Sequence, residues 1–238
     1  MSTGFMAAVQ AVLGHPLFGF GITLGAYQLA LALFERTRWV FLQPVLLSMT
    51  LVIGVLLLCG IDYADYRASV NMLSVFLGPA TVALAVPLFL NLKRIRQLFW
   101  PVLLTLLLAG SLATALGIGF GWLLGADHVM QMTLLPKSVT SPIAMLVAEQ
   151  LGGIAALAAV FVLLTGVIGA IFGPALLTRL GVRSPAARGM ALGLTAHAVG
   201  TAQALQEGEE TGAFSALAMS LMGVASAILL PLVMLLFL

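Results

Sequence analysis

The chain has 238 residues, of which 62% are hydrophobic and only 8% are charged, and its formal net charge is +2. Soluble domains carry about 25% charged residues, so the composition excludes a soluble globular protein. The small net charge gives no reason to expect nucleic-acid binding, and the single cysteine, Cys59, excludes an intramolecular disulfide. A mean hydropathy of +1.17 instead predicts an all-α integral membrane protein.

Apolar runs follow one another along the chain, each long enough to cross about 30 Å of hydrocarbon as a helix. We expect these segments at Leu17–Phe34, Leu42–Gly60, Leu73–Asn91, Trp100–Gly125, Val129–Gly152, Ile154–Leu177, Gly189–Leu205 and Gly212–Leu238. Every connection between them is short. The sequence therefore predicts a single transmembrane domain over residues 1–238, built as a bundle of about seven or eight segments.

Basic residues gather in three loops, around Arg36, Lys93 and Arg183, and acidic loops alternate with them. Cytoplasmic loops collect Lys and Arg, so we expect all three basic loops on the cytoplasmic side. They share that side only if one of the segments between them does not cross the membrane. The best candidate is Val129–Gly152, which a break over Pro136–Pro142 would allow to enter and leave on the same side. This reading predicts seven crossings, one re-entrant hairpin and a cytoplasmic C-terminus.

Two other stretches are interrupted, one rich in proline at Leu77–Pro87 and one polar at His197–Ala202. Broken segments at matching places in two halves of a chain indicate a transporter site near the membrane midplane. An inverted repeat with halves at 13–126 and 127–238 would account for them. The alternative is that small residues merely let helices pack closely. The residues expected to break helices are Gly78, Pro79, Pro87, Pro136, Pro142 and Gly200.

The break in the middle of the chain has the chemistry of an anion site. Ser141 before Pro142 predicts a helix start, and the free N–H groups and dipole of such a start favour an anion. Lys137 adds a positive charge, while the hydroxyls of Ser138 and Thr140 can donate hydrogen bonds. The expected ligand is therefore a small carboxylate. The expected substrate-binding residues are Thr81, Lys137, Ser138, Thr140, Ser141, His197 and Thr201.

Each of these residues also has a structural reading. Lys137 could extend along the apolar surface to reach water, and the hydroxyls beside it could simply satisfy the broken backbone. Glu149 could carry protons, although pairing with a basic group at the membrane surface is favoured. His197 could serve a site, including proton coupling, or could pack between helices. These alternatives stay open at the level of the sequence.

Other kinds of chemistry have little support. Three scattered histidines and one cysteine lack the spacing of metal ligands, so no metal and no cofactor are expected. No nucleophile stands near a base, so the sequence does not predict an enzyme.

Three stretches resemble the signatures of the LrgB/CidB family of integral membrane proteins. They are Leu77–Leu88, Pro136–Met145, and His197–Ala202 followed by Gly208–Glu209 and Gly212–Met219. Their order, their spacing and the chain length all match, so the resemblance covers nearly the whole chain. Gln203 departs from the pattern, because a basic residue often stands at this position in the family.

The resemblance implies two functions. Bacterial members are described as antiholin-like proteins that modulate murein hydrolase activity and autolysis together with a small LrgA/CidA-like membrane partner. The plastid glycolate/glycerate transporter is similar to these two proteins fused, and this chain resembles its LrgB-like half. Relatives are also linked to pyruvate transport.

Residues and resemblance together predict a multi-pass carrier of the bacterial inner membrane. It would move a small monocarboxylate of the glycolate, glycerate, lactate or pyruvate type by alternating access, as a homodimer. The implied kinship with such carriers places Thr81, Thr140 and His197 in a mobile core and the first helices in a scaffold. The alternative is an antiholin-like modulator that acts with an LrgA/CidA-like partner.

Overall fold

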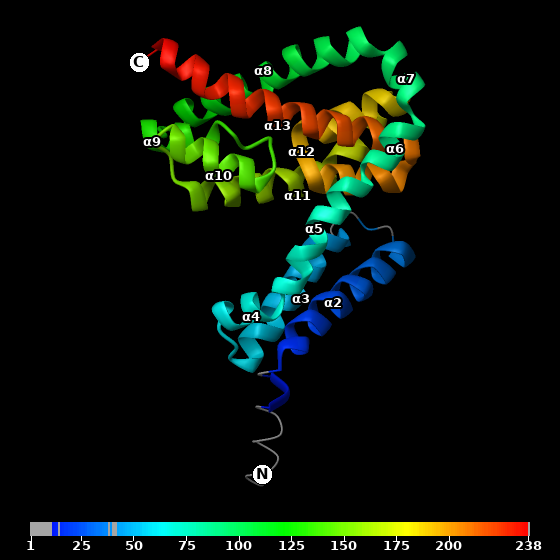
Figure 1. The fold of residues 1–238 in the computed structure, drawn as a ribbon, viewed down its shortest axis with the longest axis vertical. Helices are drawn as coiled ribbons and strands as arrows, with labels where there is room; N and C mark the ends of the chain where they lie inside the picture. The colour runs from blue at the N-terminus through cyan, green and yellow to red at the C-terminus, as the bar shows by residue number, and fades with distance from the viewer. Residues whose placement is uncertain (1–10, 14, 38, 40–41, 238) are drawn as a thin grey trace. The chain divides into compact units, whose positions relative to one another are not determined.

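The computed structural model describes residues 11–13, 15–37, 39 and 42–237, and every regular element in these ranges is a helix (Figure 1). Contacts divide the chain into two compact units that meet in sequence between Ala83 and Leu84. This boundary does not coincide with the repeat halves expected at 13–126 and 127–238. The internal repeat therefore stays a prediction.

The first unit contains four described helices: α2 (Pro16–Thr37), α3 (Pro44–Cys59), α4 (Tyr63–Ser69) and α5 (Asn71–Ala83). The Gln43 side chain accepts a hydrogen bond at the start of α3, and α3 ends at Gly60 in the left-handed conformation, with φ 64°. Helix α2 packs on α3 and α4. A 2.8 Å hydrogen bond between the hydroxyls of Thr23 and Tyr66 joins α2 to α4.

The second unit contains α6 (Ala85–Leu90), α7 (Leu92–Gln97), α8 (Phe99–Leu123), α9 (His128–Leu134), α10 (Ser141–Gln150), α11 (Ala155–Arg179), α12 (Pro185–Glu207) and α13 (Glu209–Phe237). Helix α12 packs mainly on α13 and α11, while α10 packs on α11. One buried apolar cluster joins α8, α10, α11, α12 and α13, and Val162 of α11 and Phe214 of α13 are among its members. This cluster positions the interrupted helices described below.

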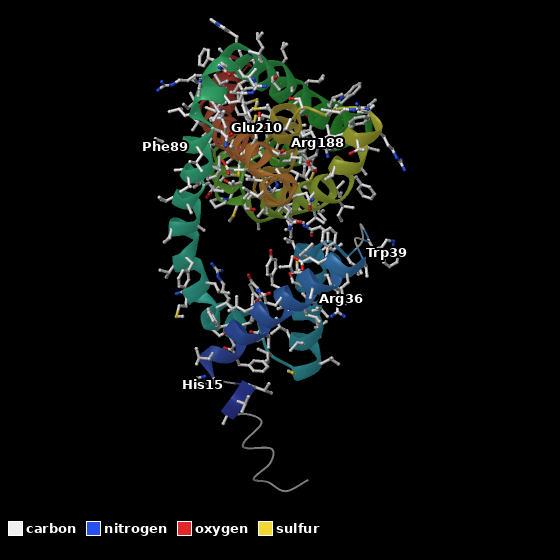
Figure 2. The ribbon with its side chains drawn as sticks, turned by 90° about the vertical axis from the view of Figure 1, so that its right-hand side faces the viewer. His15, Arg36, Trp39, Phe89, Arg188 and Glu210 are labelled. Carbon is white, nitrogen blue, oxygen red and sulfur yellow. The ribbon has the colours of Figure 1, made fainter. Side chains whose placement is uncertain are left out.

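The prediction of an all-α membrane protein is confirmed. Five segments are long and apolar enough to cross a membrane: Leu17–Thr37, Asn71–Leu90, Phe99–Leu123, Ala155–Arg179 and Glu209–Met234. Helix α3 is apolar but shorter, with 16 residues. Large apolar side chains such as Leu108 and Phe89 lie exposed on the helices, and Figure 2 shows Phe89 projecting outward from its helix. Leu238, the predicted end of the last segment, lies outside the described residues.

The predicted crossing at Gly189–Leu205 is wrong, because α12 reverses direction. Its backbone leaves the helical conformation at His197, with φ 40° and ψ −125°. Arg188 Nε lies 2.7 Å from Glu207 Oε2, although 19 residues of straight helix would separate their backbones by about 28 Å. Helix α12 is therefore a hairpin of two arms, 185–196 and 198–207. The predicted number of crossings therefore falls from seven to six. The predicted cytoplasmic C-terminus required an odd number of crossings, so it no longer follows.

The expected breaks at Gly78, Pro79 and Gly200 are also displaced. Gly78 and Pro79 lie inside α5, which continues to Ala83. The interruption falls at Leu84 instead, since the ring of Pro87 would clash with the carbonyl four residues earlier in a continuous helix. Gly200 is helical, and the reversal of α12 occurs three residues before it.

Candidate functional site

The first interruption lies in the second unit, where α9 ends at Leu134 and α10 begins at Ser141. The chain turns between them through hydrogen bonds from Lys137 N to Leu134 O (3.1 Å) and from Val139 N to Pro136 O (3.3 Å). Pro136 is fully buried and Val139 is only 1% exposed. This connection is therefore an interior loop between two short helices, one of 7 and one of 10 residues.

The start of α10 differs from the prediction in one respect. The N-cap residue is Thr140, with φ −71° and ψ 148°, so Ser141 and Pro142 are the first two helical residues and Ser141 is not the cap. The Thr140 side chain makes no capping hydrogen bond. Because Pro142 lacks an N–H, it needs no partner at this position. The first turn of α10 is thus left without a side-chain cap.

Three hydroxyls surround this helix start without being used by the fold. Within the described residues, the side chains of Ser138, Thr140 and Ser141 have no hydrogen-bond partner. Ser138 is only 5% exposed, yet no fully buried side-chain oxygen or nitrogen lacks a partner within the described residues, so the unpaired Ser138 hydroxyl keeps some access to the exterior. The reading in which these hydroxyls satisfy the broken backbone is therefore not what the structure shows. They are available to a ligand.

The Lys137 side chain extends toward α8, and its role in binding substrate stays a prediction. Its ammonium Nζ donates to the Ala113 carbonyl of α8 at 3.0 Å. The side chain crosses α8 at Gly117, where a Cβ would lie 2.8 Å from Nζ. Lys137 is half-buried, and its charge is held by the backbone of α8. We therefore describe Lys137 as a residue that ties the interrupted loop to α8.

The second interruption is the reversal of α12 at His197. The side chain is 3% exposed, and Nε2 lies 2.9 Å from the Val162 carbonyl of α11. A carbonyl can only accept, so Nε2 carries the hydrogen and Nδ1 is the nitrogen whose protonation can change. Nδ1 has no hydrogen-bond partner among the described residues. A φ of 40° is unusual for a residue other than glycine, and such conformations concentrate at functional sites.

Thr201 and Ser215 hold this reversal in place. Thr201 Oγ1 donates to the His197 carbonyl at 2.8 Å and lies 3.0 Å from Ser215 Oγ of α13. At Gly200, a Cβ would collide with the Leu192 carbonyl of the opposite arm. The expected substrate-binding residue Thr201 thus supports the turn, and Gly200 allows the two arms of α12 to approach closely.

The two interruptions share one core. Val139, from the first interruption, and Leu194, three residues before His197, belong to the same buried cluster as Val162. Val162 also offers its carbonyl to His197. The structure therefore assembles both interruptions around α11 within the second unit.

Two predicted site residues do not belong to either interrupted segment. Thr81 lies in α5, in the first unit, and its side chain is outside the described part of the structure. Glu149 is exposed near the end of α10 and forms no ion pair within the described residues, so the favoured pairing with a basic group is absent there. Among the described residues, no group of three His, Cys, Asp or Glu side chains could hold a metal ion.

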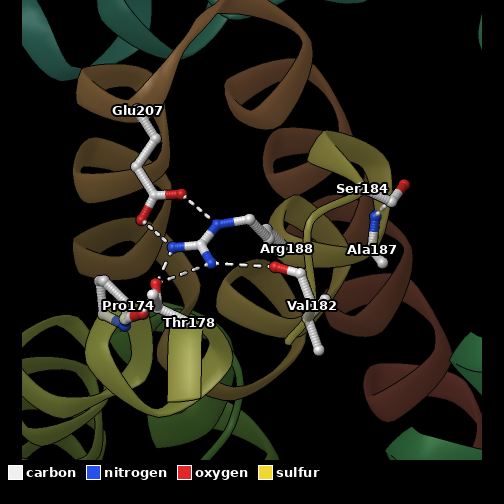
Figure 3. A network of polar contacts seen from close by, with 7 residues as sticks. All are labelled: Pro174, Thr178, Val182, Ser184, Ala187, Arg188 and Glu207. Carbon is white, nitrogen blue, oxygen red and sulfur yellow. Dashed lines mark hydrogen bonds and ion pairs between the residues drawn. The ribbon is translucent and has the colours of Figure 1, made fainter. Parts of the chain in front are cut away.

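A polar clamp at the open end of the α12 hairpin was not anticipated from the sequence (Figure 3). Arg188 forms two hydrogen bonds with the Glu207 carboxylate, at 2.7 and 3.0 Å. It also donates to Thr178 Oγ1 and to the carbonyls of Val182 and Pro174, at 3.1 to 3.3 Å. Arg188 thus fastens both arms of α12 to α11. No local spacing connects positions 188 and 207, so no sequence pattern indicates this clamp.

Apolar segments long enough to cross a membrane and two buried interruptions define an all-α, multi-pass membrane protein with helical hairpins in its interior. The chain belongs to the LrgB-like family, whose model matches residues 23–236. It is therefore a multi-pass protein of a bacterial membrane.

Relatives match almost end to end. The uncharacterized protein YxaC of Bacillus subtilis (strain 168) is 36% identical over 216 residues, which are 91% of this chain and 94% of that protein. The antiholin-like protein LrgB of Bacillus mycoides (strain KBAB4) is 30% identical over 220 residues, which are 92% of this chain and 96% of that protein. No solved structure matches the chain.

Proposed function

We propose that the chain is a membrane carrier that moves a small monocarboxylate of the glycolate, glycerate, lactate or pyruvate type by alternating access. The observation that carries the proposal is the pair of buried helix interruptions within one unit. Lipid offers no hydrogen bonds to an interrupted backbone, so such breaks occur where protein or a watery cavity surrounds them. Broken helices that meet near the midplane are typical of secondary transporters.

The first interruption supplies groups suited to a carboxylate. Ser138, Thr140 and Ser141 offer unpaired hydroxyls, and the uncapped start of α10 adds N–H groups and the positive end of the helix dipole. Lys137 contributes by holding the loop against α8 rather than by direct contact. The free Nδ1 of His197 is the proposed place for a coupled proton, in preference to the exposed Glu149.

A second candidate function is favoured by the printed names of the relatives. Antiholin-like proteins of the LrgB name match nearly the whole chain at 30% identity. On this reading the chain would be an antiholin-like modulator of murein hydrolase activity and autolysis, acting with a small LrgA/CidA-like membrane protein. The names support this candidate more directly than they support transport, whereas the unpaired hydroxyls support transport. A homodimer is proposed for either function.

Binding of the four acids to the purified protein in detergent tests the first candidate. We expect saturable binding by calorimetry, and we expect Ser138→Ala to weaken it about tenfold, because a hydrogen bond to a charged group contributes about 1.5 kcal/mol or more. The matched control is Ser226→Ala, which alters another serine that is 5% exposed but belongs to α13 rather than to either interrupted segment. Its affinity should equal that of the unmodified protein.

Two results would argue against the carrier. Equal losses of affinity in the Ser138→Ala and Ser226→Ala proteins would indicate a general packing effect rather than a contact between Ser138 and the acid. Absence of binding for every acid, from protein shown to be folded, would favour the antiholin-like candidate. The next measurement would then be lysis in cells that produce the chain with and without an LrgA/CidA-like protein.

A further inference from the structure

An apolar groove of about 350 Å³ lies between α8 and the first arm of α12. Its lining includes two rows of small or narrow side chains, each with a spacing of four residues, together with larger apolar side chains such as Met190, Leu194 and Phe214. The rows are Pro101, Thr105 and Ala109 on α8, and Ala187, Ala191 and Thr195 on α12. Residues four apart share one helix face, so the groove follows the helix axes for about 12 Å.

Helices α8 and α12 begin at the same end of this groove. Arg94, just before α8, is 3.4 Å from Glu210 at the start of α13. Glu207, three residues earlier, binds Arg188 in the first turn of α12. The lining residues Leu98 and Ser184, which precede the two helices, therefore mark one common mouth of the groove.

This mouth carries unpaired positive charge. Arg183 immediately precedes Ser184, and Lys93 and Arg96 lie within five residues of Leu98. All three side chains belong to exposed residues, and none forms an ion pair within the described part of the chain. Of the nearby carboxylates, Glu207 and Glu210 are paired with Arg188 and Arg94, and Glu209 accepts a hydrogen bond from the Asn91 side-chain amide at 3.1 Å. The three unpaired basic residues therefore outnumber the one carboxylate without an ion pair. Charged side chains also place this end at the membrane surface, since they are costly in hydrocarbon.

We propose that this groove is a binding site for an anionic phospholipid, with one acyl chain between α8 and α12 and the phosphate at Arg183, Lys93 and Arg96. The lining is mostly apolar and suits an acyl chain, and its hydroxyls are few: Thr195 already donates to Ala191 O of its own helix at 2.7 Å, which leaves only Thr105 and Ser184. Basic residues at the mouth of a groove between membrane helices select anionic headgroups. The site goes beyond the proposed transport function and does not depend on it.

Lipid binding to the full chain in detergent micelles, measured by native mass spectrometry with phosphatidylglycerol and phosphatidylcholine, tests this site. We expect tighter binding of phosphatidylglycerol, and we expect Arg96→Gln with Arg183→Gln to weaken it about thirty-fold. The matched control is Arg36→Gln with Arg67→Gln, which removes two exposed arginines of the first unit. This control should leave the affinity unchanged.

A second variant tests the acyl chain separately. Ala187→Leu with Ala191→Leu fills the groove and should lower phosphatidylglycerol binding at least tenfold, whereas Ala156→Leu, at an exposed position of α11, should not. Equal binding of phosphatidylglycerol and phosphatidylcholine would overturn the proposal. Equal losses of phosphatidylglycerol affinity in the two double arginine variants would overturn it too. A folded groove-filling variant that binds phosphatidylglycerol normally would overturn it as well. If that variant does not fold, the arginine pairs decide the result.

Discussion

Replacing Arg188 with methionine is expected to lower the free energy of unfolding by about 3 kcal/mol, because it removes a bidentate bond to the partly buried Glu207 carboxylate together with three further hydrogen bonds. The two side chains are only 15% and 18% exposed. Arg188 also gives up its bonds to Thr178, Val182 and Pro174, which fasten the α12 hairpin to α11. Reversible unfolding in mixed micelles would measure the change.

The matched control is Arg94→Met, the same substitution in the other ion pair of the described chain. Arg94 and Glu210 are 52% and 35% exposed and 3.4 Å apart. Exposed pairs contribute about 0 to 1 kcal/mol, so this variant should remain close to the unmodified protein. Similar losses in the two variants would show that Arg188 has no special role in closing the hairpin.

Replacing Gly193 with valine is expected to have an effect of similar size, about 3 kcal/mol, by overpacking the contact between α12 and α13. A Cβ at Gly193 would collide with the Ser215 carbonyl and would lie 2.9 Å from Ala218 Cβ. A backbone carbonyl within a helix cannot turn aside, so the two helices would have to separate. This separation would also disturb the bond between Thr201 and Ser215 that supports the reversal at His197.

Gly119→Val provides the comparison for that result. Gly119 lies within α8, and nothing is found within 4 Å of the position that its Cβ would take. The exchange of glycine for valine should therefore change stability by less than about 1 kcal/mol. The close packing of α12 on α13 would be contradicted if Gly193→Val left the free energy of unfolding unchanged, or if Gly193→Val and Gly119→Val lowered it equally.

The interruption at Pro136–Thr140 could be predicted from the sequence, because proline, lysine and hydroxyls within an apolar run leave few structural solutions. The direction of Lys137 could not be predicted. Its long side chain reaches a carbonyl on α8, 24 residues away, and only the packed helices determine which acceptor lies within reach.

The reversal of α12 escaped prediction for a different reason. It depends on a histidine with φ 40°, which no local propensity favours. Its partners are distant in sequence: Val162 on α11, Ser215 on α13, and the clamp between Arg188 and Glu207. Gly200 lets the two arms approach closely, and Gly189 and Gly193 pack against α13, but the same small residues also occur in helices that cross a membrane side by side.

The most direct test of the central claim is counterflow of labelled glycolate, glycerate, lactate and pyruvate into liposomes that contain only this chain, with and without a pH gradient. The proposed carrier predicts saturable exchange of at least one acid, lost in Thr140→Val and His197→Ala proteins that remain folded, and retained in Ser226→Ala. Folded, correctly inserted protein that exchanges none of the four acids would contradict transport by the chain alone.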